Sequence, residues 1–517
     1  MKSFLKIDAW DLAAGESTAV YIADTGHMTT PDDTPGNAYF EGRLTLPPSF
    51  EITMFKDGVT GGKSDGGFGE IEAANPDGGL DALAGYAFDG RAWTFRRGDR
   101  FDTATTVASG VIESVEISWD TVRFNIRDRS AELETPIQTN LYAGDNSGPT
   151  GVEGTEDDLK DKEKPLAFGY CLNVPCVCVN SSTLIYQVHD GQIHAVGAVY
   201  DKGAALTATA DYTDLAALQA ATFTAGHYAT CLALGLIRLW VTPAGDVTAD
   251  IEGDAAGGVY VSTAGAIVSR ILTTRTGYTT ADFSAADLAT LDAANPAPVG
   301  LFIEAGDSTD IDEAIDTLLR SVGAAWGPDS TGFFRFQRLE APAGTPVKTL
   351  TGTEVLDNDN LARLPAHDVA GGVPYWRVRV KYARNWTKQN ASSLAGVVTD
   401  ARRAWLAEEW RTVSVEDALV LTAHPFAPTL EVETYLTDAA AALAEAARLL
   451  ALHGAERARY TVPLDPSEAM GIEIGDVVEL DLDRFVSPGG QLFVVVGISR
   501  DGETDTDSEA VELTLYG

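Results

Sequence analysis

The chain has 517 residues, of which 45% are hydrophobic and 22% are charged, and its 76 acidic and 37 basic residues give a net charge of −39. This length predicts several domains, and the composition excludes a disordered chain. The acidic balance argues against a protein that binds nucleic acid through counterion release, because phosphates would be repelled. One local basic cluster does not change this expectation in so acidic a chain. It consists of Arg91, Arg96, Arg97 and Arg100.

The N-terminus, MKSFLKIDAW, lacks the apolar stretch of a signal peptide, and no segment reaches the ~18 apolar residues of a membrane span. We therefore expect a chain made in the cytoplasm. The four cysteines are too few to staple a chain of this size, so free thiols are predicted. Cys176 and Cys178 alternate on one face of a predicted strand, where small buried side chains fit. A zinc site would need a second pair of ligands at the right spacing, and Cys231 alone does not supply it.

The succession of strand-like patterns in residues 1–143 predicts an N-terminal β domain. Its clearest feature is a hairpin at 115–126, in which apolar residues alternate on both sides of a turn at Asp120-Thr121 and give the sheet one buried face. The alternating residues are Val115, Ile117, Trp119, Val122, Phe124 and Ile126. The glycine-rich run at 58–69 is expected to be a flexible surface loop. Within it, Gly62-Lys63-Ser64 is similar to the end of a phosphate-binding loop, but Asp57 stands where that pattern needs glycine.

Residues 144–164 combine Gly, Pro, Ser and dense charge, which is typical of a linker, and we expect a domain boundary there. A β-rich middle domain follows at 165–270. It contains two predicted strands, 184–188 and 194–200, around an Asp-Gly turn that predicts a hairpin. His189 and His194 would then face each other across the strands. Two such histidines could bind a metal, but imidazoles on the polar side of a hairpin are the favoured interpretation.

An α+β domain is predicted at 271–345. A helix at 311–322 has its apolar residues on one face, and Asp310 with Glu313 forms a capping-box pattern. A turn at 326–329 then leads to a short strand at 332–336. The remaining residues, 346–517, predict a C-terminal β-barrel domain with an inserted helix at 438–453 and strands at 477–482, 492–498 and 511–515. Together these patterns predict a β-rich α+β, multidomain fold with small β-barrel or sandwich domains and a few packed helices.

Signatures of catalysis are missing from the sequence. There is no Gly-x-Ser-x-Gly nucleophile elbow and no His-Glu-x-x-His zinc helix. The acidic loop Asp501 to Glu509 has alternating carboxylates that could hold calcium, although its glycine and distal glutamate do not match the standard spacing. Carboxylate pairs for glycoside hydrolysis are numerous, but nothing selects one pair. We therefore predict no enzyme, no catalytic residues, no cofactor and no resident metal.

Several segments resemble the hub proteins of phage tail tips and baseplates. The C-terminal run 472–480 contains the Gly475-Asp476-Val477 step that begins the closing β-domain in that family, and 490–498 and 511–517 continue it. Further similar segments are 311–338, 77–100 and Tyr382 to Thr387. The resemblance implies a hub subunit that forms a homotrimer whose β-barrel domains match the sixfold tail tube. No recognisable lysozyme or peptidase segment is present.

The resemblance also implies a virion location at the tail tip or baseplate. The implied partners are further copies of the chain, distal tail and tube proteins, the tape-measure protein, and tail fibre or receptor-binding proteins. DNA would pass transiently, and an acidic wall would not hold it. Trp is enriched at interface anchors, so some tryptophans could anchor partners, although ordinary core positions are an equal alternative. They are Trp376, Trp386, Trp405 and Trp410.

Three alternatives stay open at this stage. Within the same class, the chain could be the hexameric distal tail ring that adapts the tube to the tip. From another class, it could be a tail-associated hydrolase of the cell wall. From a third, it could be a calcium-dependent surface adhesin. Mass measurement of the assembly, a zymogram and the calcium dependence of the melting temperature separate these possibilities.

Overall fold

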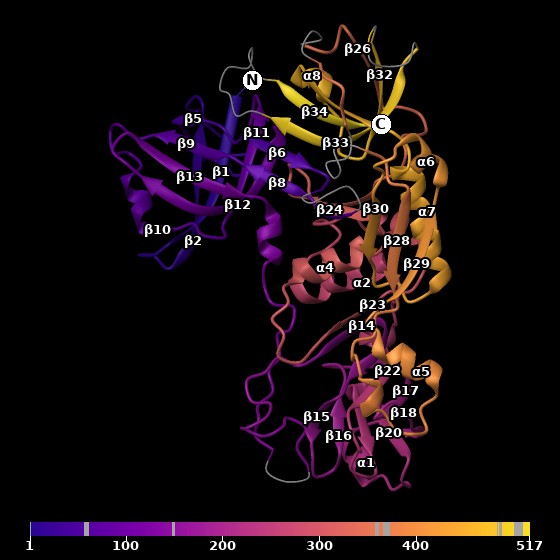
Figure 1. Cartoon of the computed structure of the whole chain (residues 1–517). Coiled ribbons are helices and arrows are strands. Elements are labelled where there is room, and N and C mark those ends of the chain that lie inside the picture. Colours follow the sequence, from indigo (N-terminus) through magenta and orange to yellow (C-terminus); the bar gives the residue numbers. More distant parts are fainter. Residues whose placement is uncertain are drawn as a thin grey trace.

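The computed structural model describes residues 2–55, 61–146, 150–356, 361–365, 373–482, 484, 489–500 and 510–517. Six sheets and a small number of helices confirm the predicted β-rich, multidomain class. The N-terminal sheet projects to one side of a column that contains the C-terminal sheet, the central helices and the middle domain (Figure 1). Among these residues, no helix has both the length and the apolar character that crossing a bilayer requires.

The N-terminal sheet has the order β3-β4-β2-β1-β11-β12-β13-β9-β5, with β10 paired to β1. Its strands are β1 (Lys2–Asp11), β2 (Glu16–Ala23), β3 (His27–Met28), β4 (Tyr39–Gly42), β5 (Leu44–Leu46), β9 (Glu70–Ala74), β10 (Tyr86–Ala87), β11 (Ala92–Gly98), β12 (Thr105–Ile117) and β13 (Thr121–Arg127). Alternating residues of these strands fill one core, because successive side chains of a strand point to opposite faces.

The predicted hairpin is present as β12 and β13, with Val122 and Phe124 fully buried. Its tip differs from the prediction. The turn is closed by the Ser118 N–H, which donates to the Thr121 carbonyl at 2.8 Å, and Trp119 is 92% exposed. The reason is that β11 pairs with β12 only as far as Val111, so the end of β12 extends past the covered part of the sheet.

The prediction of a flexible surface loop at 58–69 is wrong for residues 61–69. Asp57 and the rest of 56–60 lie outside the described residues. Residues 61–69 form two strand segments, β7 (Gly62–Lys63) and β8 (Asp65–Phe68), which join other sheets together with the preceding strand β6 (Phe50–Thr53). β6 pairs with the C-terminal β33 and with β8, and β7 pairs with β24. Glycine permits this approach, because Gly62 has φ +124° and a Cβ there would lie 2.7 Å from the Arg320 side chain.

The middle region contains two five-stranded sheets, in the orders β18-β17-β22-β14-β23 and β15-β16-β21-β20-β19. The elements are β14 (Leu166–Pro175), β15 (Val177–Asn180), β16 (Ile185–Gln187), β17 (Ile193–Asp201), β18 (Ala204–Ala205), β19 (Thr207–Asp211), α1 (Leu215–Ala220), β20 (His227–Cys231), β21 (Leu236–Leu239), β22 (Val247–Asp254) and β23 (Gly300–Ile303). The predicted hairpin around Asp190-Gly191 is wrong, because β16 and β17 belong to different sheets. The chain crosses from one sheet to the other at this turn.

The described part of 144–164 lies against the second of these sheets. Asn146 donates its amide to the Val179 carbonyl at 2.6 Å, and Asn180 donates to Gly151 at 2.6 Å. Leu159 is only 8% exposed. The segment is therefore tied to β15 by hydrogen bonds and one apolar side chain, despite its polar composition.

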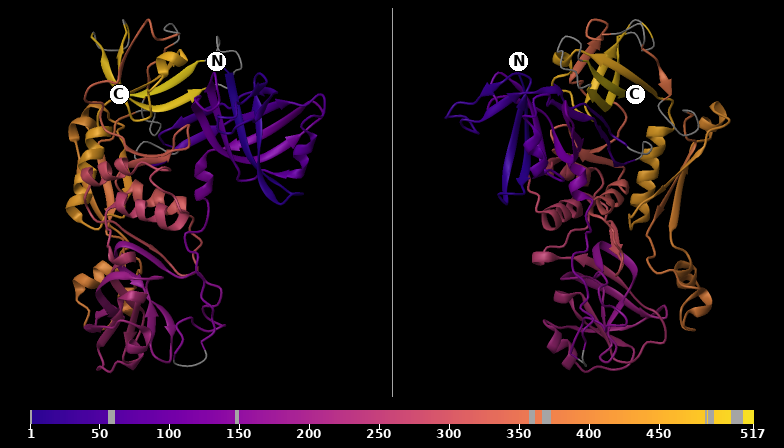
Figure 2. Two further views of the ribbon diagram at one scale, coloured as in Figure 1. Left: turned by 180° about the vertical axis from the view of Figure 1, so that it is seen from behind. Right: turned by 90° about the vertical axis from the view of Figure 1, so that its left-hand side faces the viewer.

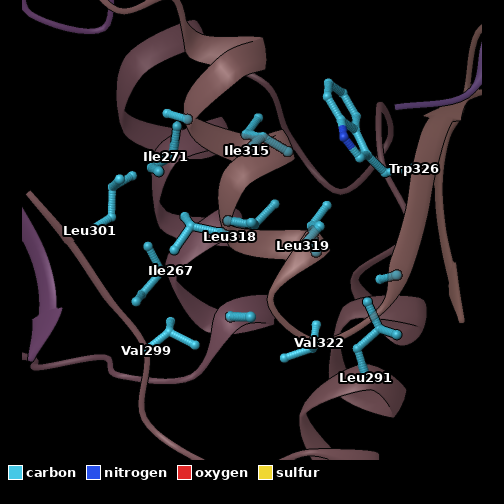
Figure 3. Packing of buried hydrophobic residues seen from close by; sticks show 14 of the residues in the cluster. Ile267, Ile271, Leu291, Val299, Leu301, Ile315, Leu318, Leu319, Val322 and Trp326 are labelled. Carbon is cyan, nitrogen blue, oxygen red and sulfur yellow. The ribbon is translucent and has the colours of Figure 1, made fainter. Parts of the chain in front are cut away.

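The central region holds the largest core (Figure 3), where Ile315, Leu318 and Leu319 pack against helix residues that include Ile267 and Ile271. Its elements are α2 (Ala264–Ile271), α3 (Ala285–Ala294), α4 (Ile311–Arg320), β24 (Ala324–Pro328) and β25 (Phe334–Arg338). The predicted helix is confirmed as α4, but the capping box is wrong. The Asp310 side chain makes no cap hydrogen bond, and the Ile311 N–H donates instead to the Thr135 carbonyl at 2.9 Å.

A three-stranded sheet, β29-β28-β30, and α7 lie beside the central helices (Figure 2). The elements are β28 (Arg377–Tyr382), α5 (Asp400–Ala407), β29 (Arg411–Glu416), α6 (Ala418–Ala423), β30 (Thr429–Glu433) and α7 (Ala439–His453). The predicted helix at 438–453 is confirmed as α7. Asp438 caps it, since its carboxylate accepts the Ala441 N–H at 2.9 Å.

The C-terminal sheet has the order β26-β32-β33-β34-β31-β27, and β6 adds to β33. Its elements are β26 (Lys348–Thr351), β27 (Leu364–Pro365), β31 (Ala458–Leu464), α8 (Pro466–Ala469), β32 (Val477–Asp481), β33 (Gln491–Arg500) and β34 (Val511–Tyr516). The three predicted strands of this region are confirmed. Within the described residues the strand order runs from β26 to β27 without closing, so a full barrel stays a prediction.

Candidate functional site

A cavity of about 590 Å³ lies where the N-terminal sheet, the central region and the C-terminal sheet meet. Its walls come from β6, the first residues of β12, β24 with the turn after it, the α8 region, and β33. Most of the wall is apolar, as in typical ligand pockets. The apolar residues include Ile52, Met54, Val107, Trp326, Ile472 and Ile498. Met470 lies at the cavity and is 80% exposed.

Most charged groups of the cavity form ion pairs or hydrogen bonds with other residues of the chain. Arg335 pairs with Asp287 at 2.8 Å and with Glu473. The Asp329 carboxylate accepts hydrogen bonds from Thr331 and from the Phe333 N–H at 3.1 Å, which holds the turn after β24. Burial raises the pKa of Asp329 above its ordinary value despite these bonds. These contacts fix the shape of the cavity wall.

The basic cluster in the N-terminal sheet is engaged in aromatic and ionic contacts. The guanidinium of Arg91 lies 5.6 Å from the ring of Trp10, and that of Arg96 lies 4.8 Å from Phe101. Arg97 lies 5.6 Å from Phe95, and Arg100 pairs with acidic side chains. This arrangement accounts for the cluster without a nucleic-acid partner.

The two histidines of the predicted hairpin have separate environments. His189 is 1% exposed and its Nδ1 accepts the Ala167 N–H at 2.9 Å, so the other nitrogen carries the proton and faces Asp254 at 3.6 Å. His194 is exposed and stacks on Tyr260 with the ring centres 4.7 Å apart. The expectation that both histidines lie on the polar side of a hairpin is therefore wrong for His189, because the chain buries it between sheets.

His189 belongs to a buried polar group that includes Asp254 and Arg270. Arg270 pairs with Asp254 at 2.6 Å. Burial alone would raise the pKa of Asp254, but the N–H of His189 that faces the carboxylate and the charge of Arg270 outweigh this effect, so the pKa is lowered. The group ties β22 to α2 and has the character of a structural ion pair.

The cysteines are free thiols, as predicted. Cys176 and Cys178 both pack against the core of the middle domain, and burial raises the pKa of Cys171, Cys176 and Cys178. Over the part of the chain that the structure describes, no group of three or more His, Cys, Asp or Glu side chains could hold a metal ion. The acidic loop Asp501 to Glu509 lies outside those residues.

Lys63, from the segment similar to a phosphate-binding loop, contacts α4. Its Nζ lies 2.9 Å from Asp312, and its backbone N–H donates to Asp316. The lysine and the backbone donor therefore face carboxylates. A phosphate at this place would meet two acidic side chains.

The four tryptophans considered as interface anchors are half-buried, and each stacks on an arginine of its own chain. Trp376 lies 4.0 Å from Arg377, and Trp386 lies 4.2 Å from Arg384. Arg384 also stacks on Trp410, and Arg402 stacks on Trp405. The two most exposed aromatic residues of the described part of the chain lie elsewhere, at Trp119 and at Phe426, which is 88% exposed beside α6. The sequence analysis considered Trp119 only as one of the alternating residues of the hairpin. It did not predict the cavity.

No family model and no curated protein matches this chain. Its structural neighbours are phage tail and baseplate proteins. One is the 43 kDa tail protein of prophage MuSo2 from Shewanella oneidensis, with 11% identity, a TM-score of 0.37, and coverage of 100% of this chain and 98% of that one. A tail protein from Neisseria meningitidis MC58 has 10% identity, a TM-score of 0.39, and coverage of 99% and 96%. A chain of the native gene transfer agent virion has 16% identity, a TM-score of 0.39, and coverage of 69% and 85%.

Proposed function

We propose that this chain is a non-enzymatic structural subunit of a phage-type tail tip or baseplate. It would act as a hub that forms a homotrimer, connects the tail tube to the tip and to host-recognition proteins, and lets DNA pass. The family resemblance of the segments around Gly475-Asp476-Val477 and at 311–338 supports this role.

The observation that carries the proposal is the exposure of large apolar side chains on a strongly acidic chain. Trp119, Phe426, Met470 and Leu419 are between 77% and 92% exposed. Trp119 is on the N-terminal hairpin. Leu419 lies on α6, and Phe426 follows that helix. Leu419 and Phe426 lie in one short segment of the chain, and large apolar side chains that are exposed together are typical of a contact with another protein.

The partners of the hub would be further copies of the chain, distal tail and tube proteins, the tape-measure protein, and tail fibre or receptor-binding proteins. The net charge of −39 supports transient passage of DNA, since an acidic wall offers phosphates no counterion-release attraction. Assembly would take place in the host cytoplasm before the subunit enters the virion.

We also propose a division into units at 1–143, 165–270, 271–345 and 346–517, with 144–164 joining the first two. The C-terminal unit would close into a small barrel, with α7 inserted in its sequence. Pairing of β6 with β33 means that the first and last units would share one sheet.

Mass measurement of the purified assembly tests the proposal. A mass of three chains supports the hub, and six chains would favour the distal tail ring. Labelled antibodies against the chain should decorate the tip of tail particles in electron micrographs. A chain that remains monomeric at ~100 µM would contradict the proposal.

The tail-associated hydrolase is the second candidate and has its own test. A zymogram with host cell walls should show no clearing by the purified chain. Reproducible clearing that survives further purification would favour the enzyme over the structural subunit.

A further inference from the structure

We propose that the outer edge of the N-terminal sheet is an acid-sensitive latch, in which protonation of His27 releases β3 from β4 and from the aromatic cluster beneath it. His27 is the first residue of β3. All groups involved belong to one chain, so the latch does not require the proposed oligomer.

The latch lies at the least secured edge of the N-terminal sheet. β3 is the outermost strand, and its ladder with β4 consists of two residue pairs, His27 with Phe40 and Met28 with Tyr39. β4 in turn joins β2 through two residue pairs. Short ladders at a sheet edge open locally at a lower free energy than the centre of the sheet does. A small change in the contacts of β3 can therefore decide whether this edge is closed.

The imidazole ring of His27 packs on an aromatic cluster. The ring centre lies 5.2 Å from that of Phe4 and 6.5 Å from that of Phe40. Phe4 and Phe40 are fully buried, and Phe101, which packs with them, is 4% exposed. These apolar contacts hold β3 against the sheet and suit an uncharged ring.

The hydrogen bonding of the ring fits only its neutral form. The Nζ atom of Lys2 lies 3.1 Å from Nδ1 of His27. An ammonium group donates and cannot accept, so Nδ1 accepts this bond and the ring proton is on Nε2. Nε2 is buried, and among the described residues it has no hydrogen-bond partner. A second proton on Nδ1 would break the bond with Lys2 and place two cations next to each other.

The other charged groups near His27 do not cancel this effect. Asp33 favours the protonated ring, but its carboxylate already accepts the Thr30 N–H at 2.6 Å and pairs with Arg100. Burial, the charge of Lys2 and the charge of Arg100 together outweigh the attraction of Asp33, so the pKa of His27 is lowered.

Acid should therefore favour the open edge. In the open form His27 is in water with the ordinary histidine pKa of about 6.5, so the open form binds the proton more tightly than the closed form does. Above that pH both forms are neutral and the latch stays closed. Below it, opening becomes more favourable until the closed form also takes up the proton. Opening leaves the backbone groups of β4 unpaired, and such an edge can accept a strand from another protein.

The first test is amide hydrogen exchange of residues 27–40, corrected for the pH dependence of the intrinsic exchange rate. Between about pH 7.5 and about pH 5.5 the protection of this segment should fall at least about threefold, within the limit of about tenfold per pH unit for one proton. His27→Gln keeps an acceptor for Lys2 and does not titrate, so its protection should be the same at both pH values. An equal fall in wild type and His27→Gln would overturn the proposal.

His194→Gln is the matched control for this test. It removes a histidine whose side chain is 51% exposed and which lies on β17 in the middle region. The protection of residues 27–40 in this variant should fall with pH as in the wild type. If His194→Gln abolished the fall, the sensor would not be His27.

The second test measures the titration of the His27 ring by NMR with labelled histidine, and it does not depend on the stability of His27→Gln. The pKa of His27 should lie below the ordinary value of about 6.5 and should rise in Lys2→Met, which removes the neighbouring charge. A wild-type pKa at or above 6.5, or a pKa that is unchanged in Lys2→Met, would contradict the latch.

Discussion

Ile52 of β6 lies directly opposite Ile498 of β33, so residues from the two ends of the chain share one sheet (Figure 1). Ile52 is 4% exposed and also lines the interdomain cavity. The N-terminal and C-terminal regions are therefore joined by backbone hydrogen bonds and by a shared apolar surface. We expect them to unfold together.

Replacing Ile52 with alanine should lower the free energy of unfolding by about 2–4 kcal/mol, because a buried Ile loses its transfer free energy and leaves a cavity. Urea denaturation followed by fluorescence and by circular dichroism should give coincident transitions at a lower midpoint. Ile117→Ala is the control, since Ile117 is 38% exposed, and its effect should stay within about 0.5 kcal/mol. Two separate transitions in the wild-type chain would contradict the shared unfolding.

The carboxylate of Glu445 on α7 lies between two arginines and is 2% exposed. It is 2.9 Å from Arg338 and 2.6 Å from Arg448. Glu445→Gln should cost about 3–5 kcal/mol of unfolding free energy, because two largely buried guanidinium groups would lose their counter-charge. Thermal or urea unfolding measures it. Glu456→Gln removes a more exposed partner, 3.5 Å from Arg363, and should cost less than about 1 kcal/mol.

Lys63 should behave as a structural residue and not as a phosphate ligand. Lys63→Gln should lower the free energy of unfolding by about 1 kcal/mol through loss of the Asp312 ion pair. Lys160→Gln, which removes a more exposed ion pair with Glu156, should have a smaller effect. Millimolar Mg-ATP should leave the melting temperature of the wild-type chain unchanged. A rise that depends on nucleotide concentration and disappears in Lys63→Gln would establish a nucleotide site.

Asp329 should make stability fall as pH rises. Because burial raises its folded-state pKa above the unfolded value of about 3.9, the folded chain binds the proton more tightly than the unfolded chain does. Below the pKa of Asp329 in the unfolded chain, this residue does not lower the free energy of unfolding. The loss of stability grows between the unfolded-state and folded-state pKa values and is complete above the folded-state pKa.

Asp329→Asn keeps the acceptor oxygen for Thr331 and Phe333 and removes the half-buried charge. The variant should be at least as stable as the wild type at pH 7, and the difference should vanish near pH 3. Urea midpoints across this pH range measure the effect. An asparagine variant that is less stable at pH 7 and equal at pH 3 would show that the charge stabilises the turn.

Local patterns predicted the elements that depend on residues close in sequence. Alternation of apolar residues predicted β12 with β13 and the strands of 477–515, and helical spacing predicted α4 and α7, because side-chain direction follows the backbone repeat of each element. The sequence also excluded common catalytic motifs. Sequence patterns did not predict which of these elements pair with one another.

Tertiary structure alone decided the placement of β6, the separation of β16 from β17 and the burial of His189. Pairing between strands depends on which distant segments cover each other's apolar faces, and alternation is the same whichever partner is chosen. For the same reason the cavity, assembled from three regions of the chain, and the exposure of Trp119 beyond the covered part of its sheet could not be predicted from sequence.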